Sequence, residues 1–127
     1  MVLSTEQLQA AYVDAERRHS ERERELLTRF QPGDGGFWAG VAESGIQAMR
    51  DKLEAVGRTQ LPLTRRRELA DTIANPGRLM DALVRDAMRY GLTAAQVEPF
   101  RTQIAVRIAS MRAEVVGHWM SSTEVAS

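Results

Sequence analysis

The stretch "PFRTQIAVRIASMRAEVVGHWM", Pro99 to Met120, decides the fold, because its apolar residues recur with the period of an α-helix. Two apolar stripes run along it. One stripe comprises Phe100, Ile104, Ile108, Met111, Val115 and Trp119, and the other comprises Val106, Ala109, Ala113, Val116 and Met120. A helix that is apolar over most of its circumference is either central in its domain or shared with another chain. We therefore expect a long, largely buried C-terminal helix.

The rest of the chain repeats the helical period, and no segment alternates in the manner of a half-buried strand. Start signals are Ser4 with Gln7, which form a capping box, and Asn75 before Pro76, which fit an N-cap and the first helical position. Thr64, and Thr93 with Gln96, suggest further caps. Because Pro99 lies too deep for an undistorted helix begun at Thr93, we expect a short turn there and then a long helix from Pro99. The predicted helices span residues 5–30, 37–56, 64–73, 76–90 and 99–120. The sequence thus predicts an all-α, compact bundle of about five helices with a long N-terminal helix.

Length and composition favour one domain. A chain of 127 residues with 43% hydrophobic content can bury a single modest core, so we assign residues 1–127 to one helical domain with a frayed tail at 121–127. No apolar run reaches the roughly 20 residues of a transmembrane helix, and the N-terminus lacks signal-peptide features. With no Cys, disulfides and thiolate metal sites are excluded. We expect a cytoplasmic protein with no membrane partner.

The charge balance predicts no partner by itself, since 17 basic residues match 17 acidic ones. All basic residues except Lys52 are arginines, which fits a GC-rich bacterial genome. Arginine makes bidentate contacts with phosphate or carboxylate, so the basic surface suits anionic groups.

The stretch "QPGDGGFWAG", Gln31 to Gly40, is interpreted as a turn and not as a phosphate-binding loop. It has no Lys-Ser/Thr pair after the glycines, no preceding strand, and Asp34 would repel an anion. Gly35 and Gly36 are expected to supply positive φ angles. Gly57 is expected to end the second helix, and Gly91 the fourth.

No catalytic constellation is visible, and we expect no enzyme activity, cofactor or metal. Glu16 and His19 have the spacing used in di-iron bundles, but such sites need a second copy and two further glutamates. The other histidine, His118, has a different partner spacing. We therefore expect both histidines at the surface.

Six arginines are the candidate anion-binding or partner-binding residues. Arg65, Arg66 and Arg67 occupy the first turn of a predicted helix, where the helix dipole disfavours each cation by roughly 0.3–1 kcal/mol. An anion would complete such a site, although Glu68 and solvent can also screen these charges. The remaining candidates lie on the outer face of the next helix: Arg78, Arg85 and Arg89.

The segment "ELADTIANPGRLMDALVRDAM", Glu68 to Met88, has the apolar spacing of a helix-turn-helix. Its "IANPGR" turn resembles the corresponding turn in alkylguanine-DNA alkyltransferases, but their activity needs a nucleophilic cysteine that this chain lacks. In the DNA-binding interpretation, the arginine run contacts phosphates while Arg78 and Arg85 contact bases. Asp81, Asp86 and the zero net charge weigh against it.

These observations favour a small non-catalytic protein–protein interaction or regulatory module of bacterial type. Its partner is another protein or a second copy of the chain in a homodimer. The residues expected in the subunit contact are Val106, Ala113, Val116 and Met120. The alternative is a helix-turn-helix-like DNA-binding regulator that uses the arginine-rich segment 64–89. A third interpretation is that this arginine face binds an acidic protein surface.

Overall fold

The protein is all-α, as predicted. The computed structural model describes residues 2–126, with side chains over residues 2–120. Its elements are α1 (Thr5–Arg29), α2 (Gly35–Gly57), α3 (Leu63–Ile73), α4 (Pro76–Arg89), the 3₁₀ turns η1 (Ala94–Gln96) and η2 (Glu98–Phe100), and α5 (Arg101–Ala126). Extended pairing within residues 2–126 is limited to a β-bridge between Leu3 and Thr59. Helix α5 continues to Ala126, so residues 121–126 of the tail that was predicted to be frayed are helical; their side chains lie outside the described residues.

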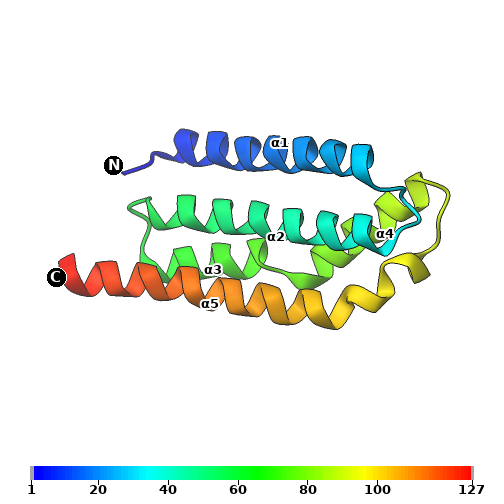
Figure 1. Ribbon diagram of the computed structural model, residues 1–127. Coiled ribbons are helices and arrows are strands. Elements are labelled where there is room, and N and C mark those ends of the chain that lie inside the picture. The colour runs from blue at the N-terminus through cyan, green and yellow to red at the C-terminus, as the bar shows by residue number, and fades with distance from the viewer. Residues whose placement is uncertain (1, 127) are drawn as a thin grey trace.

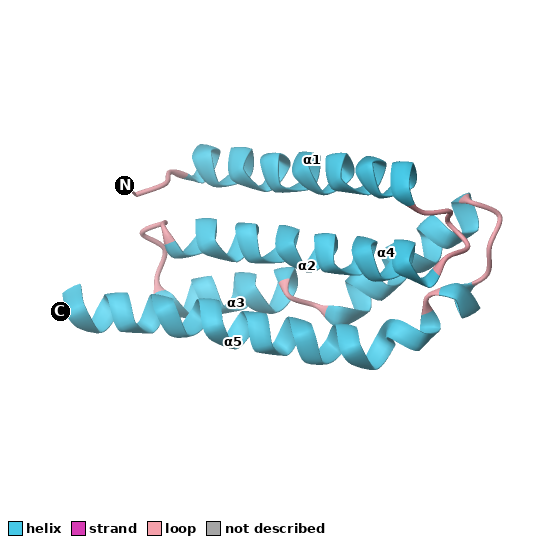
Figure 2. Ribbon diagram, in the orientation of Figure 1, coloured by secondary structure: helices cyan, strands magenta, loops and turns pink. Residues whose placement is uncertain are grey.

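Helix α2 lies in the middle of the structure, between α1 and α5 (Figure 1). The chain direction of α1 opposes that of α2, whereas α5 runs in the same direction as α2. Short loops join α1 to α2 and α3 to α4, and the longer connection before α5 contains the two 3₁₀ turns (Figure 2). The core gathers around α2, with Phe37, Trp38 and Leu53 fully buried against Leu83 of α4 and Ile108 of α5.

The helix starts follow the predicted caps in two cases of four. The Ser4 hydroxyl accepts a bond from the Gln7 backbone N–H at 3.1 Å, and the Gln7 side chain completes the capping box. Asn75 accepts from the N–H of Gly77 at 2.9 Å. The Thr64 prediction was wrong, because α3 already begins at Leu63 without a side-chain cap. Thr93 also makes no capping bond, but the short turn expected before the last helix is present as η1 and η2.

The glycines expected to end α2 and α4 lie at those helix ends, but the glycines at the start of α2 differ from the expectation. Gly91 has φ +77° after α4, as a helix-ending glycine should. Gly35 and Gly36 do not have positive φ, because they form the first residues of α2. Gly57 is the last residue of α2 and is required for packing: a Cβ atom there would lie 2.2 Å from Trp119 Nε1. Its small size lets α5 approach α2 closely.

Helix α5 is not largely buried, which corrects the prediction. The buried residues are all on the first stripe: Ile104, Ile108, Met111, Val115 and Trp119. The second stripe is mostly exposed, and Val106 retains 62% of its accessible surface. The physical reason is the position of α5 at the edge of the structure, where its inner side packs on α2 and α4 and no described helix covers its outer side (Figure 1).

Candidate functional site

The three consecutive arginines at the start of α3 point in different directions. Successive residues of an α-helix are rotated by about 100°, so their side chains diverge. Arg65 pairs with a glutamate of its own helix, and Arg66 Nε donates to the Leu61 carbonyl at 2.9 Å. Arg67 Nη2 lies 2.9 Å from Met120 Sδ of α5. The three guanidinium groups therefore do not form one anion site.

Two of the three predicted arginines on α4 do share a site. Arg78 and Arg85 line a groove between α1, α2 and α4 with a volume of about 320 Å³. Arg89 lies one turn further along α4, where it is 3.6 Å from Asp86 and does not line the groove. The groove also receives Lys52 from α2, which sequence reasoning did not select.

Small residues create this groove. Gly45 and Ala48 of α2 face Ala82 of α4, so the helices leave space between them where larger side chains would fill it. The helices still touch beside the groove, because a Cβ atom on Gly45 would lie 2.6 Å from Leu79 Cδ1. Leu79 and other apolar side chains form the floor. The charged residues Glu16, Lys52, Arg78 and Arg85 form the rim, together with His19.

His19 is half-buried between α1 and α2, so the prediction of a surface position was wrong. Its Nδ1 lies 2.7 Å from Ser44 Oγ, and Arg22 Nε donates to the same oxygen at 2.8 Å. Arg22 also donates to the Ser44 carbonyl at 3.0 Å. Ser44 is the one buried polar residue in the described core, at 6% exposure. His118, in contrast, is exposed as predicted.

The contact between His19 Nδ1 and Ser44 Oγ is a hydrogen bond in either neutral tautomer of His19, because the hydroxyl group can donate one hydrogen and accept two. Burial lowers the pKa of His19 below its ordinary value of 6.5, with the positive charge of Arg22 acting in the same direction and the charge of Glu16 against it. His19 is therefore mainly neutral at pH 7, and its ring lines the groove.

A carboxyl pair connects α1 with α4 near this centre. Glu23 of α1 and Asp86 of α4 are hydrogen-bonded to each other, and burial together with the Asp86 charge raises the pKa of Glu23. Arg89 opposes this shift. Two carboxyl groups in contact share a proton more readily than they both ionise. The attachment of α1 is thus polar at several points, with only Leu8 and Ala15 fully buried on this helix.

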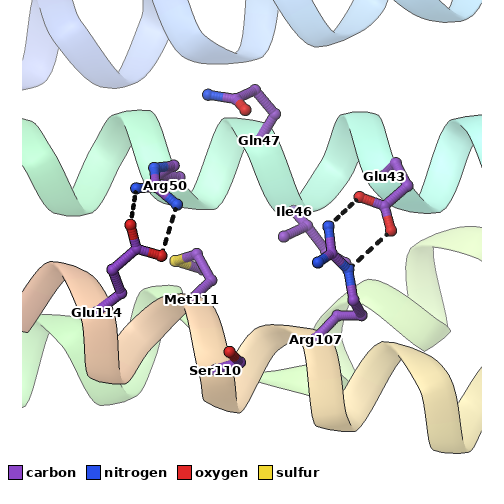
Figure 3. Close-up of a pocket in the computed structure, with 8 residues that line it drawn as sticks. All are labelled: Glu43, Ile46, Gln47, Arg50, Arg107, Ser110, Met111 and Glu114. Carbon is purple, nitrogen blue, oxygen red and sulfur yellow. Dashed lines mark hydrogen bonds and ion pairs between the residues drawn. The ribbon is translucent and has the colours of Figure 1, made fainter.

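Two arginine–glutamate ion pairs join α5 to α2, on a side of α2 that does not line the groove (Figure 3). Arg50 Nη2 lies 2.7 Å from Glu114 Oε1, and Arg107 Nη2 lies 2.7 Å from Glu43 Oε2. The Arg50 hydrogen bond and charge hold the pKa of Glu114 below its ordinary value. The hollow between the pairs has a volume of about 100 Å³. Because each of these charges is paired with a residue of the other helix, we interpret the two ion pairs as fixing the register of α5 on α2. We do not interpret the hollow between them as a ligand site.

The outer face of α5 bears no charged side chain between Thr102 and Met120. It lies opposite the buried stripe and consists of Thr102, Val106, Ala109, Ala113, Val116, Gly117 and Met120. Val106, Ala109, Ala113 and Gly117 are exposed, whereas Val116 and Met120 are half-buried. The charged residues of α5 lie on its flanks: for example, Arg112 pairs with Asp71 of α3 at 2.6 Å. The structure thus places all four predicted subunit-contact residues on one face.

Within the described residues, no group of three or more His, Asp or Glu side chains could hold a metal ion. Glu16 pairs with Lys52 and not with His19. Over the same part of the chain, no helix is both long enough and apolar enough to cross a membrane. No family model matches the chain, and neither a curated protein nor a solved structure is significantly similar to it.

Proposed function

We propose that the protein is a non-catalytic interaction module that pairs with a second copy of itself through the outer face of α5. The observation that carries the proposal is that α5 contributes no charged residue to this face, in a chain of which 27% of the residues are charged; Arg67 of α3 reaches the face at its Met120 end. A helix that is apolar on both sides is either central or shared. Because α5 lies at the edge of the structure, a shared helix accounts better for its composition.

The residue spacing suits an antiparallel pair of α5 helices. If a two-fold axis passes through Ala113, each residue packs against the residue of the second copy that lies equally far from Ala113 in the opposite direction along the chain. Val106 then packs against Met120, and Ala109 against Gly117. These small residues permit an interaxial distance near the lower end of the usual 8–10 Å. An uncharged face also needs no complementary charge, so it can match a copy of itself.

The expected affinity is modest. The described part of the outer face spans about 28 Å at 1.5 Å per residue, so one helix pair buries less than the roughly 1,200–2,000 Å² of standard stable interfaces. We therefore expect dissociation constants in the range of about 1–100 µM, equivalent to about −8 to −5.5 kcal/mol. Such a pair forms and separates readily, which suits a regulatory module.

The helix-turn-helix alternative receives less support. Arg78 and Arg85 border a groove that α1 also lines, so the side of α4 assigned to bases is partly enclosed. The arginine run of α3 diverges and does not follow one phosphate backbone. A labelled random duplex in fluorescence anisotropy tests this alternative, since phosphate contacts produce binding that weakens steeply with salt. Absence of binding at low salt would remove DNA as the partner.

Sedimentation equilibrium tests the pairing. We expect wild type to show a mass rising toward twice the 14.2 kDa of the chain as its concentration increases to about 100 µM. Ala113→Glu should remain monomeric, because two carboxylates would meet at the axis. Ala10→Glu is the matched control, since it makes the same change at an exposed site of α1. If wild type stays monomeric, or if both variants pair equally well, self-pairing through α5 is wrong and a different protein becomes the expected occupant.

A further inference from the structure

The rim of the groove between α1, α2 and α4 has a surplus of positive charge. Lys52, Arg78 and Arg85 contribute three positive charges and Glu16 one negative charge, so the ionised lining residues sum to +2, with His19 neutral. Within the described part of the chain, Lys52 is the only one of these cations with a carboxylate partner, which is Glu16. A net charge of +2 beside a hollow is complementary to a doubly charged anion.

The two arginines are available to bind such a group. Arg85 has no ion pair or hydrogen bond among the described residues, and Arg78 donates only to the Thr72 carbonyl, at 3.1 Å. They lie two helical turns apart, with backbones separated by about 10.5 Å, and Ala82 between them leaves the space open. Long arginine side chains can converge over that distance. A guanidinium group binds phosphate through two parallel N–H donors.

The acidic residues of α4 lie outside the groove lining. Asp81 interacts with Arg101 at the start of α5, and Asp86 interacts with Glu23 and Arg89, although its charge also acts on His19. His19 adds a neutral imidazole ring whose Nδ1 is bonded to Ser44. Among the described residues, the site therefore combines two cations without an ion pair, one paired cation and one imidazole.

The floor of the groove is apolar. Ala48, Met49 and Leu79 line it, so the part of a ligand that lies deepest is uncharged. A volume of about 320 Å³ is near the lower end of the range for small-molecule sites. It is too small for a helix or a nucleic-acid duplex. Rim and floor together select a small molecule with one doubly charged end and one apolar end.

We infer that this groove binds a small organic phosphate monoester, with its phosphate held by Arg78 and Arg85 and its organic part on the apolar floor. A phosphate monoester carries a charge of about −1.5 to −2 at pH 7, which matches the surplus at the rim. The inference is independent of pairing through α5, since none of the α5 side chains that the structure describes lines the groove. It would make the module responsive to a phosphorylated metabolite.

Phenyl phosphate is a suitable probe, because it unites a phosphate monoester with an apolar ring. We expect binding to full-length wild type, detected by isothermal titration calorimetry at low salt. Inorganic phosphate should bind more weakly because it lacks the ring, and benzoate because it is a monoanion. The double variant Arg78→Gln/Arg85→Gln should weaken phenyl phosphate binding at least about tenfold, or 1.4 kcal/mol. The matched control Arg24→Gln/Arg58→Gln removes the same charge from exposed positions outside the groove and should bind as wild type does.

A second variant tests the position of the ring without any change of charge. Ala82→Leu fills the groove between the two arginines and should abolish binding of phenyl phosphate while leaving the helical circular dichroism unchanged. If phenyl phosphate fails to bind wild type at about 10 mM, equivalent to about −2.7 kcal/mol, the inference is wrong. It is also wrong if the groove variants and the control bind equally, which would indicate nonspecific attraction to arginine, or if benzoate binds as tightly as phenyl phosphate.

Discussion

Ser44→Ala is the substitution that tests most directly how α1 is held on α2. Ser44 Oγ is 2.7 Å from His19 Nδ1 and 2.8 Å from Arg22 Nε, in a residue of which only 6% is exposed. Removal of the hydroxyl breaks both hydrogen bonds and leaves His19 Nδ1 and Arg22 Nε without this partner. The same substitution retains the bond from Arg22 to the Ser44 carbonyl, because that oxygen belongs to the backbone.

The magnitude follows from the two bonds that are lost. A hydrogen bond from a charged donor contributes about 1.5–3 kcal/mol and a neutral one about 0.5–1.5 kcal/mol. The better helix propensity of alanine returns up to about 0.7 kcal/mol, and water reaches half-exposed Arg22 and recovers a further part. We expect a net loss of about 2 kcal/mol in the free energy of unfolding. For a chain of this length, that lowers Tm by roughly 5–10 °C.

Thermal unfolding followed by circular dichroism at pH 7 measures this loss. Ser20→Ala is the matched control, since Ser20 is an exposed residue of α1 and the helix-propensity gain is the same. If Ser44→Ala unfolds at the same temperature as Ser20→Ala, the Ser44 hydroxyl does not hold α1 on α2. Double variants with Arg22→Met would then show whether the two side chains act independently.

Three further predictions concern packing and pH. Gly57→Ala should lower the free energy of unfolding by about 1–3 kcal/mol, because its Cβ would overlap the rigid Trp119 ring. Gly117→Ala has open space around its Cβ and should raise the free energy of unfolding of the monomer by up to about 1 kcal/mol. Urea titration of both variants measures these changes. Because the folded state lowers the pKa of His19, the unfolded state binds its proton first as pH falls through the ordinary value of 6.5, and stability is lost there; His19→Gln should reduce that loss. Because the folded state raises the pKa of Glu23, stability is lost as pH rises from the ordinary value of 4.5 to the folded pKa, so Glu23→Gln should stabilise the protein at pH 7 and have little effect near pH 3. Equal effects of Glu23→Gln at both pH values would contradict the shared-proton pair.

The fold class could be read from the sequence because helical periodicity repeats along the whole chain. Caps such as Asn75 depend on a few adjacent residues and were also predictable. Gly57 shows where local reasoning stops: a glycine at a helix end suggested a turn, but its requirement comes from Trp119, which is 62 residues away in the chain. The same limit applies to α5. Its two apolar stripes can be recognised in the sequence, but which of them the other helices cover cannot.

The groove and the His19 centre could not be predicted because they depend on the positions of three helices. Within "ERRHSERERE", Glu16 to Glu25, no aliphatic residue signals burial, so a solvated surface was the natural interpretation. The missed signal is on α2, where Ser44 occupies the same helical face as buried Val41 and Ala48. A polar residue on a buried face requires partners, and Ser44 finds them in His19 and Arg22 of α1.

The two proposed surfaces are separable because α2 stands between them. Its residues that line the groove, Gly45, Ala48 and Lys52, lie on a different side from Glu43 and Arg50, which hold α5. A pair formed through α5 would therefore leave both copies of the groove open. A ligand that altered the strength of pairing would have to act through α2 or through the tilt of α4 against α5. Measuring the dimer constant with and without phenyl phosphate distinguishes a module with two independent surfaces, for which the constant is unchanged, from one in which the groove regulates assembly.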